Sequence, residues 1–441
     1  MTSGDDEHVA PGDDEHVAPG GHALPSRRRV LVLSTDPIGP EMPGPAIRAW
    51  QLAKVLGEQM DVVLASTVAV SGAHPTAQLR LAVGPALAEL VDGADVVFAP
   101  SALVYMADEL RAGDKPVAVD IYDPYHLENL EMGDHGLGGA VADHDRAVAR
   151  QAGILNAALR RGDFFACASE RQRDFWLGSL SALGRVNPYN YGVSPVLDQL
   201  VAVVPFGLPT EPPCRQGPGL RGVMPGVGPE DKVVLWGGGV YNWLDPVSVV
   251  RAVDLLRHEV PEVRLVFLGM RHPNPDLPEM GVVAELEAVS SALGLTGKHV
   301  FFNRGWVPYE SRADFLLDAD VAVSTHLDHV ETRYSFRSRV LDYLWAGLPM
   351  VLTGGDVLAK EVTAAGVGLA VAAGDVEGLA RALAQMLASP PPPGRFGPLA
   401  LRHTWERAAE PLVRFCLTPR RAPDLMVERL SPDAAAWEPN R

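Results

Sequence analysis

Cysteine is scarce in this chain of 441 residues, and long apolar runs are missing from it. The three cysteines (Cys167, Cys214 and Cys416) lie far apart and form no CxxC pair, which argues against a disulfide framework and a zinc site. We therefore expect a reducing, cytoplasmic environment. No apolar run approaches the ~20 residues that cross a bilayer, and the acidic, polar start is unlike a secretory signal.

Basic residues are also in the minority. The chain has 38 Lys and Arg against 55 Asp and Glu, which gives a formal net charge of −17. Nucleic acids and anionic membranes are bound by basic surfaces, so we expect neither as a partner. Apolar residues make up 47% of the chain, as in globular proteins with sizeable cores. The length predicts two or three domains rather than one.

Short apolar runs that alternate with helical patterns dominate the sequence after its first residues. The first such run is Val30 to Ser34, and a helical pattern through Trp50 and Leu56 follows it. This alternation predicts βαβ units and parallel sheets that are covered on both faces. The expected fold class is α/β, with two doubly wound, Rossmann-like domains that face a cleft.

The expected domain boundaries follow from breaks in this pattern. The octapeptide GDDEHVAP occurs twice in residues 4–19, and its polar composition cannot form a core. The pattern near Trp405 predicts one last helix, which Pro411 should kink. We expect a disordered tail (1–27), a first, acceptor-side domain (28–204), a Gly- and Pro-rich linker (205–230), a second, nucleotide-sugar-binding domain (231–395), a helix that crosses back to the first domain (396–420) and a C-terminal tail (421–441).

Candidate binding residues lie in the loops after the strands, because ligands of open parallel sheets bind beyond the carboxyl ends of the strands. Gly44 and Arg48 follow the first strand, where small residues let a phosphate approach backbone N–H groups. In the second domain, Gly238 and Gly239 follow a strand directly, and Arg271 follows the next one. A plain turn explains the glycines about as well, and Arg271 taken alone is better explained as a surface arginine.

The segment 331–349 is the richest in candidate binding residues. Ser335 is expected to cap a helix, so that the N–H groups of Phe336 and Arg337 would face an anion. Asp342 would lie two turns further along, on nearly the same face. Three arginines crowd the start of this helix: Arg333, Arg337 and Arg339. A nucleotide diphosphate would fit this arrangement, and a solvated basic helix is the alternative.

These motifs, in this order, resemble those of GT-B glycosyltransferases, most of all the retaining glycosyltransferase family 4, over roughly residues 28–415. That family carries two glutamates on one helix, the second shortly before a Gly-x-Pro. Asp342 holds the second position, which implies a contact with the nucleotide ribose, and Tyr334 holds the first. The resemblance implies a nucleotide-diphosphate sugar (GDP or UDP) as donor, a small hydrophilic acceptor, and neither metal nor cofactor.

Two sets of residues are expected at the site. The donor is expected to contact Gly44, Gly238, Gly239, Arg271, Trp306, Val307, Tyr334, Ser335, Phe336, Arg337 and Asp342. Catalysis is expected to involve Asp123, His126, Glu331 and Arg48. The resemblance implies that the leaving diphosphate deprotonates the acceptor, so positioning and charge stabilisation matter more than a strong base. Asp123 and His126 follow the strand that ends near Ile121, and each could equally be a polar residue with a purely structural role.

Three departures from the family pattern stand out. The basic pair that usually follows the glycine loop is absent, and Asn242, Trp243 and Asp245 lie near its places. Tyr122 stands where a histidine is usual, and Tyr334 where a glutamate contacts the donor sugar. Two DxD matches, at residues 143–145 and 318–320, are short enough to arise by chance, so no metal site is predicted.

The function expected is transfer of a sugar, with retention, to a small acceptor. The motifs also resemble glycosyltransferases of actinomycete antibiotic pathways, including the thiol-glycosylating type of lincosamide assembly. Two other classes stay open: a non-catalytic sugar-nucleotide binder, and a nucleotide-sugar epimerase or phosphorylase on the same fold. A glycogen-type phosphorylase would need a lysine-bound pyridoxal phosphate, for which no motif is evident.

Overall fold

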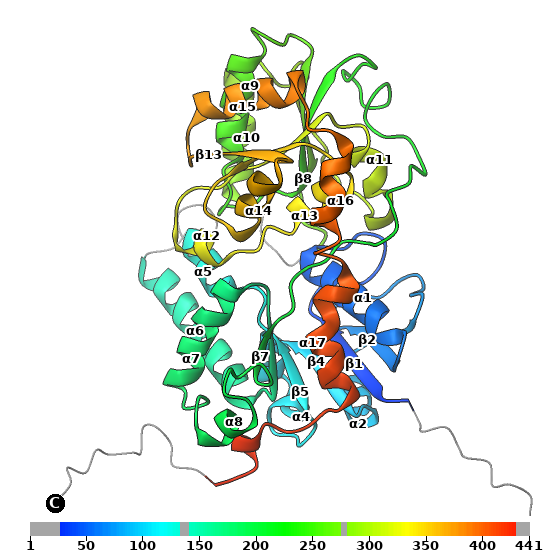
Figure 1. Cartoon of the computed structure of the whole chain (residues 1–441), viewed down its shortest axis with the longest axis vertical. Coiled ribbons are helices and arrows are strands. Elements are labelled where there is room, and N and C mark those ends of the chain that lie inside the picture. Colours follow the sequence, from blue (N-terminus) through cyan, green and yellow to red (C-terminus); the bar gives the residue numbers. More distant parts are fainter. Residues whose placement is uncertain (1–26, 133–140, 275–279, 429–441) are drawn as a thin grey trace, which may run out of the picture.

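The computed structural model describes residues 27–132, 141–274 and 280–428. These residues form two α/β domains, one above the other in Figure 1, each built on a parallel sheet. The first sheet has seven strands in the order β3-β2-β1-β4-β5-β6-β7, and the second has six in the order β10-β9-β8-β11-β12-β13. The predicted fold class is confirmed. No helix in the described ranges is long and apolar enough to cross a membrane.

The first domain contains seven strands and the helices between them. Its strands are β1 (Arg29–Ser34), β2 (Asp61–Ser66), β3 (Ala77–Leu81), β4 (Val96–Pro100), β5 (Val117–Asp120), β6 (Phe164–Cys167) and β7 (Val201–Val203). Its helices are α1 (Gly44–Gly57), α2 (Pro85–Gly93), α3 (Ser101–Met106), α4 (Asp108–Arg111), α5 (Tyr125–Glu128), η1 (Asn129–Met132), α6 (Val141–Arg161), α7 (Glu170–Ala182) and α8 (Pro188–Val193).

The second domain repeats this arrangement. Its strands are β8 (Lys232–Gly239), β9 (Val263–Gly269), β10 (Val300–Phe302), β11 (Val321–Ser324), β12 (Met350–Thr353) and β13 (Gly368–Val371). Its helices are α9 (Pro246–Leu256), α10 (Gly281–Ala292), η2 (Tyr309–Ser311), α11 (Arg312–Leu316), α12 (Val330–Tyr334), α13 (Arg339–Trp345), α14 (Val357–Ala365) and α15 (Val376–Ala388). The chain then continues through η3 (Pro393–Arg395), α16 (Phe396–Ala400), α17 (Trp405–Leu417) and η4 (Pro423–Leu425).

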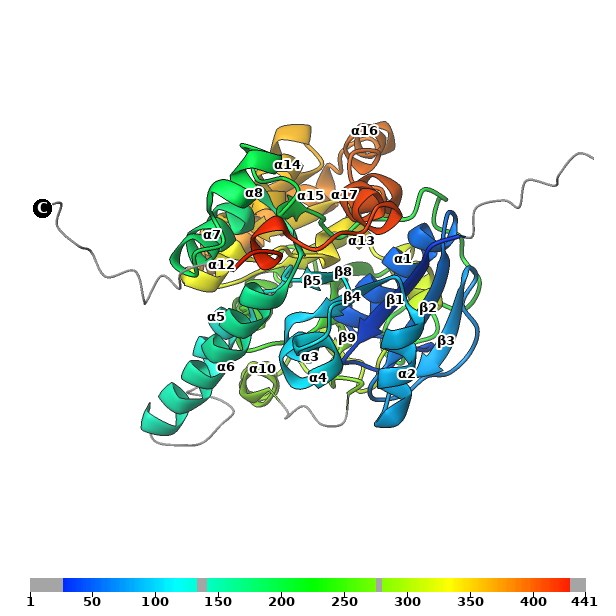
Figure 2. The same ribbon diagram turned by 90° about the horizontal axis from the view of Figure 1, so that it is seen from below.

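Both faces of the first sheet are covered, which explains why central strands such as β1, β4 and β6 are apolar without alternation. Seen from below (Figure 2), α1 and α17 lie on one side of the sheet and α2, α3 and α4 on the other. Along β1, Val30 and Val32 belong to the core under α1 and α17, whereas Leu31 and Leu33 belong to the core under the opposite helices. Successive residues of one strand therefore serve two different cores.

The last helices tie the two domains together. Helix α16 packs against α13 and α14 of the second domain, and α17 packs against α1 of the first (Figure 1). The amphipathic helix α17 continues through Pro411. The interdomain segment contacts these helices through Leu208. Its N–H donates to the carbonyl of His403 at 2.8 Å, and its carbonyl accepts from the N–H of Trp405 at 3.2 Å.

The segment between the domains is held by the aspartates of the second DxD match. Asp318 accepts hydrogen bonds from the backbone N–H groups of Leu220 (2.5 Å) and Arg221 (3.1 Å). Asp320 accepts from Val233 N–H at 2.7 Å. Both carboxylates thus fix the entry into the second domain and lie outside the cavity described below.

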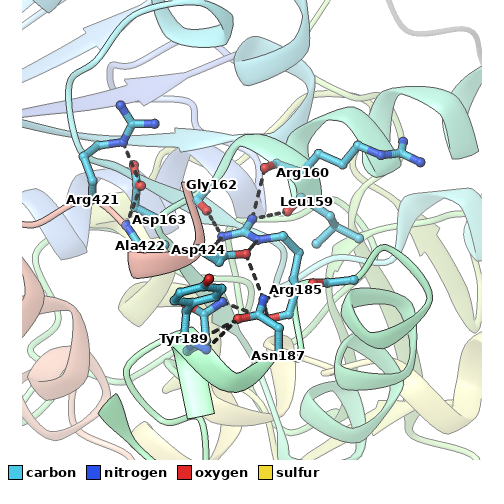
Figure 3. Close-up of polar contacts among 12 residues, drawn as sticks. Leu159, Arg160, Gly162, Asp163, Arg185, Asn187, Tyr189, Arg421, Ala422 and Asp424 are labelled. Atoms are coloured by element: carbon cyan, nitrogen blue, oxygen red, sulfur yellow. Dashed lines mark hydrogen bonds and ion pairs between the residues drawn. The ribbon is translucent and has the colours of Figure 1, made fainter. Parts of the chain in front are cut away.

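The residues after α17 dock on the first domain (Figure 3). Asp424 is fully buried and accepts from Arg185 Nε at 2.7 Å and Nη2 at 3.2 Å. Asp163 accepts from Arg421 Nε at 3.0 Å and from Ala422 N–H at 2.8 Å. Residues 421–425, which the sequence assigned to a tail, are therefore anchored by buried ion pairs. The remainder of that tail from residue 429, and residues 1–26 of the expected N-terminal tail, lie outside the described residues.

Candidate active site

A cavity of about 310 Å³ lies between the two domains. Its walls come from segments that follow β1, β5, β8 and β9 and from residues 331–339, so it opens at the carboxyl ends of both sheets. Polar and aromatic residues of both domains line it, among them Asp36, Gly44, Tyr122, Asp123, Glu128, Tyr241, Trp243, His272, Glu331, Ser335, Phe336, Arg337 and Arg339. This is where the sequence predicted a ligand-binding cleft.

The first-domain wall carries a pair of carboxyl groups that share a hydrogen bond, Asp123 and Glu128. Burial, with the nearby carboxylates of Glu331 and Asp120, raises the pKa of Asp123 to about 7. Burial and the charge of Asp123 raise the pKa of Glu128 well above its ordinary value. Both carboxyl groups therefore hold their protons more tightly than exposed carboxyl groups do. The described ranges contain no group of three or more His, Cys, Asp or Glu side chains placed to hold a metal ion.

The second-domain wall carries two arginines. Arg337 forms a bidentate ion pair with Glu331, with Nη1 to Oε1 at 2.9 Å and Nη2 to Oε2 at 2.6 Å. Arg339 donates from Nη2 to the carbonyl of Gly239 at 2.8 Å, and its guanidinium carbon lies 4.9 Å from the centroid of the Trp236 ring. Positive charge therefore faces the first-domain carboxyl pair across the cavity.

The helix expected to begin at Ser335 begins four residues later. Helix α12 ends at Tyr334 and α13 starts at Arg339, with a non-helical break over residues 335–338 between them. The Ser335 hydroxyl donates to the carbonyl of Thr332 at 3.1 Å, so it does not cap a following helix. That prediction is wrong because Ser335 adopts φ −71° and ψ 154° and ends α12. The break places residues 335–338 along the cavity wall.

Known proteins share the second domain and the overall fold. Residues 231–389 match the family described as Glycosyl transferases group 1. The second domain is thus similar to group 1 glycosyltransferase domains. None of the curated proteins matches the chain in sequence.

The whole chain resembles several solved structures. One is sucrose-phosphate synthase from Thermosynechococcus elongatus, at 16% identity and a TM-score of 0.59, covering 88% of this chain and 98% of that one. Anabaena HepE in complex with UDP-glucose has 14% identity and a TM-score of 0.59, covering 88% and 97%. Trehalose-6-phosphate synthase OtsA has 14% identity and a TM-score of 0.60, covering 89% and 100%. Such identities show the fold alone, which is GT-B, as the sequence predicted.

The cavity brings together six of the predicted site residues. They are Gly44, Asp123, Glu331, Ser335, Phe336 and Arg337. The others do not line it: Arg48, His126, Gly238, Gly239, Arg271, Trp306, Val307, Tyr334 and Asp342. Several of these support the cavity from outside or join the two domains.

Arg48 lies beneath the cavity. Its side chain is fully buried and donates to both carboxylate oxygens of Asp120, from Nε at 2.8 Å and from Nη2 at 3.0 Å. The guanidinium carbon lies 4.7 Å from the ring centroid of Tyr122, which lines the cavity. Arg48 therefore fixes the end of β5 and the ring above it, rather than reaching a bound ligand.

His126 and Tyr334 meet around Phe175 of α7. His126 stacks on Phe175 at 5.8 Å, and burial lowers the pKa of the imidazole. The Tyr334 ring packs on the same phenyl ring at 4.7 Å. The Gln172 side-chain amide donates to the carbonyls of Tyr334 and Tyr122, both at 2.7 Å. Tyr334 thus lies at a contact between the domains.

The remaining predicted donor residues surround the second-domain strands. Trp306 donates from Nε1 to the carbonyl of Met42 at 3.1 Å, a further contact between the domains, and Asp342 accepts from Arg312 Nε at 3.1 Å. Gly239 belongs to β8 and offers its carbonyl to Arg339. The side chain of Arg271 is exposed.

Sequence reasoning missed several cavity residues that also follow strands. Tyr241 and Trp243, after β8, stack with centroids 4.9 Å apart and planes at 3°. His272 follows β9 and lines the same wall. Asp36, after β1, accepts from Asn274 Nδ2 of the other domain at 3.1 Å. The rule that ligands bind beyond the strand ends would have found all of them if it had been applied to every strand.

Proposed function

We propose that this protein transfers a sugar from a nucleotide-diphosphate sugar to a small acceptor. The observation that carries the proposal is the interdomain cavity, with arginines on the second-domain wall and a hydrogen-bonded carboxyl pair on the first. A diphosphate is bound by positively charged groups that donate hydrogen bonds to it. The hydroxyl group that receives the sugar needs a neighbouring group that accepts its hydrogen bond. One cavity offers both on opposite walls.

The comparisons support this proposal. The second domain is similar to group 1 glycosyltransferase domains, and HepE, which shares the fold, is described in complex with UDP-glucose. A UDP-sugar is therefore the first donor to test, and a GDP-sugar the second. As the resemblance to glycosyltransferase family 4 implies, transfer would proceed with retention and without a metal.

In the proposed reaction, the bond between the sugar's anomeric carbon and the diphosphate oxygen breaks, and its electron pair leaves with the diphosphate. The acceptor oxygen or sulfur forms the new bond on the same face, and its proton passes to the leaving diphosphate. Ionised Asp123 would orient the acceptor by accepting its hydrogen bond. The contacts of Trp306 and Gln172 between the domains would exclude water that hydrolyses the donor.

The test is incubation with a panel of UDP- and GDP-sugars and small polyol, amine and thiol acceptors, followed by mass spectrometry. We expect acceptor-dependent release of the nucleoside diphosphate and an acceptor heavier by one sugar. Tight binding with neither product would indicate a non-catalytic sugar-nucleotide binder. Conversion of the donor without any acceptor would indicate an epimerase.

The finer parts of the proposal have their own measurements. An acceptor of the antibiotic-pathway type, a thiol included, is expected from the motif resemblance and would be identified by the same acceptor panel. NMR of the product's anomeric proton would decide retention, and activity in the presence of EDTA would decide metal independence. Fractionation of the source cells would test the expected cytoplasmic location.

A further inference from the structure

Strand β8 ends in three glycines, and the family pattern places a basic pair in the segment directly after such a strand. In this protein the positive charge near the end of β8 comes from another element, α13. The places where the pattern has its basic pair are occupied by neutral or acidic residues with structural partners. Asn242 accepts from Val282 N–H at 3.1 Å, and Asp245 caps α9 by accepting from Ser248 N–H at 3.0 Å. Trp243 is stacked on Tyr241. The segment after β8 therefore offers a diphosphate no cation of its own.

Arg339 brings a guanidinium to this strand end from the first turn of α13. It lies over Trp236, binds the Gly239 carbonyl, and lines the interdomain cavity. Its other terminal nitrogen, Nη1, is buried and has no hydrogen-bond partner among the described residues. Burial lowers the pKa of this guanidinium, and the positive charge of Arg337 lowers it further.

The second arginine of the cavity, Arg337, has a carboxylate partner. Both terminal nitrogens of Arg337 are already bound to the two carboxylate oxygens of Glu331. Among the described residues that line the cavity, Arg339 is thus the only lysine or arginine without a carboxylate partner. A partly buried cation without a carboxylate partner, beside a cavity, favours an anionic ligand there.

We propose that Arg339 binds the diphosphate of the donor and stabilises its charge as the sugar leaves, taking over the role of the absent basic pair. This inference rests on the proposed function. The guanidinium over Trp236 would offer Nη1 to a phosphate oxygen while Nη2 keeps its bond to the carbonyl of Gly239. Charge that develops on the diphosphate in the transition state would be met by a donor already in place.

Calorimetry with UDP, GDP, uridine and guanosine tests this role on the full-length protein. Arg339→Gln should weaken binding of the preferred nucleoside diphosphate about 10- to 100-fold and leave binding of its nucleoside unchanged. Arg339→Lys keeps the charge without the fork and should lie between wild type and Arg339→Gln. The matched control is Arg333→Gln, which removes the same charge from an exposed side chain of α12 and should change affinity less than about two-fold.

The outcomes separate this inference from the proposed function. Wild-type diphosphate affinity in a normally melting Arg339→Gln protein would overturn the role of Arg339 and leave the proposed function standing. If Arg339→Gln does not fold, wild-type diphosphate affinity in Arg339→Lys would overturn the proposed hydrogen bond from the guanidinium to the diphosphate. A wild-type protein that binds none of the nucleotides would overturn both proposals. An equal loss of nucleoside and diphosphate binding would show that Arg339 only shapes the cavity.

Discussion

Glu331 lies on α12 and Arg337 in the helix break that follows it, and each terminal nitrogen of the arginine binds one oxygen of the carboxylate. Their side chains are only 7% and 1% exposed. Removing one partner of such a pair leaves an uncompensated buried charge, whereas replacing both is far less costly. The pair therefore fixes residues 335–338 as the cavity wall, and the two side chains act together.

Arg337→Ala should lower the free energy of unfolding by about 3–5 kcal/mol, because Glu331 would then be buried without a counter-ion. Urea denaturation measures this loss. The double variant Glu331→Gln/Arg337→Met is the control, since it removes both charges and should recover most of the loss. A single variant as stable as wild type would contradict the account of the pair.

The same two variants separate support of the wall from direct nucleotide binding. The sequence predicted that Arg337 binds the diphosphate, which would make Arg337→Ala lose about 1.5–3 kcal/mol of nucleotide affinity. Because the structure pairs Arg337 with Glu331, the informative measurement is calorimetry on the double variant. If Arg337 contacts the diphosphate, the double variant stays weak although its stability returns. If the double variant recovers both stability and nucleotide affinity, Arg337 supports the cavity wall and does not contact the diphosphate.

Asp342→Asn should weaken nucleotide binding about 2- to 10-fold if the carboxylate accepts from the ribose, as its position in the motif implies. Its side chain is 40% exposed and pairs with Arg312, so the melting temperature should hardly change. Calorimetry with the preferred nucleotide measures the effect. Asp328→Asn is the control, since Asp328 is an exposed carboxylate of the same domain. Equal affinities for the two variants would place Asp342 outside the binding site.

Much of the fold could be predicted from the sequence because buried parallel strands leave a strong local signal. The run at Val30 to Leu33 is apolar on every residue, and the structure shows that both of its faces are covered. The break at residues 335–338 could not be predicted in this way. Ser335 is a favourable helix cap in isolation, but the long-range contacts around Gln172 and the local Glu331–Arg337 pair favour an extended backbone there.

Part of the candidate site could be predicted because some of its residues carry a local signal in the sequence. Asp123 and Gly44 follow strands directly, so their place beyond a strand end is a local property of the sequence. The roles of Arg48 and Arg339 depend on partners far along the chain, Asp120 and Gly239, which no spacing rule supplies. Whether an arginine reaches a cavity or lies beneath it is decided by such tertiary partners.

Asp424→Ala should lower the free energy of unfolding by about 3–5 kcal/mol, because Arg185 would be left buried without its counter-ion. Thermal and urea unfolding measure the loss. Glu410→Ala is the control, since Glu410 forms an exposed i,i+4 pair with Arg414 and should contribute less than about 0.5 kcal/mol. Similar, small losses in both variants would show that the C-terminal segment of Figure 3 contributes little to the stability of the first domain.

Asp123→Asn should reduce turnover roughly 100-fold, because a misoriented acceptor is no longer held for reaction, while nucleotide affinity hardly changes. The nucleotide would be bound mainly by the second domain, across the cavity from Asp123. Since the pKa of Asp123 is raised to about 7, wild-type turnover should rise as the pH increases through 7, and the variant should lose this rise. Asp143→Asn, an exposed carboxylate on α6, is the control.

The raised pKa of Asp123 also predicts how the stability of the protein changes with pH. This raised pKa means that the folded state holds the proton more tightly than the unfolded chain between its ordinary pKa of 3.8 and about 7. The contribution of Asp123 to stability is therefore greatest below this window and decreases as the pH rises through it. Asp123→Asn should flatten that decrease in urea titrations at pH 5 and pH 8. A steeper decrease in the variant, or equal losses of turnover and nucleotide affinity, would contradict the role assigned to this residue.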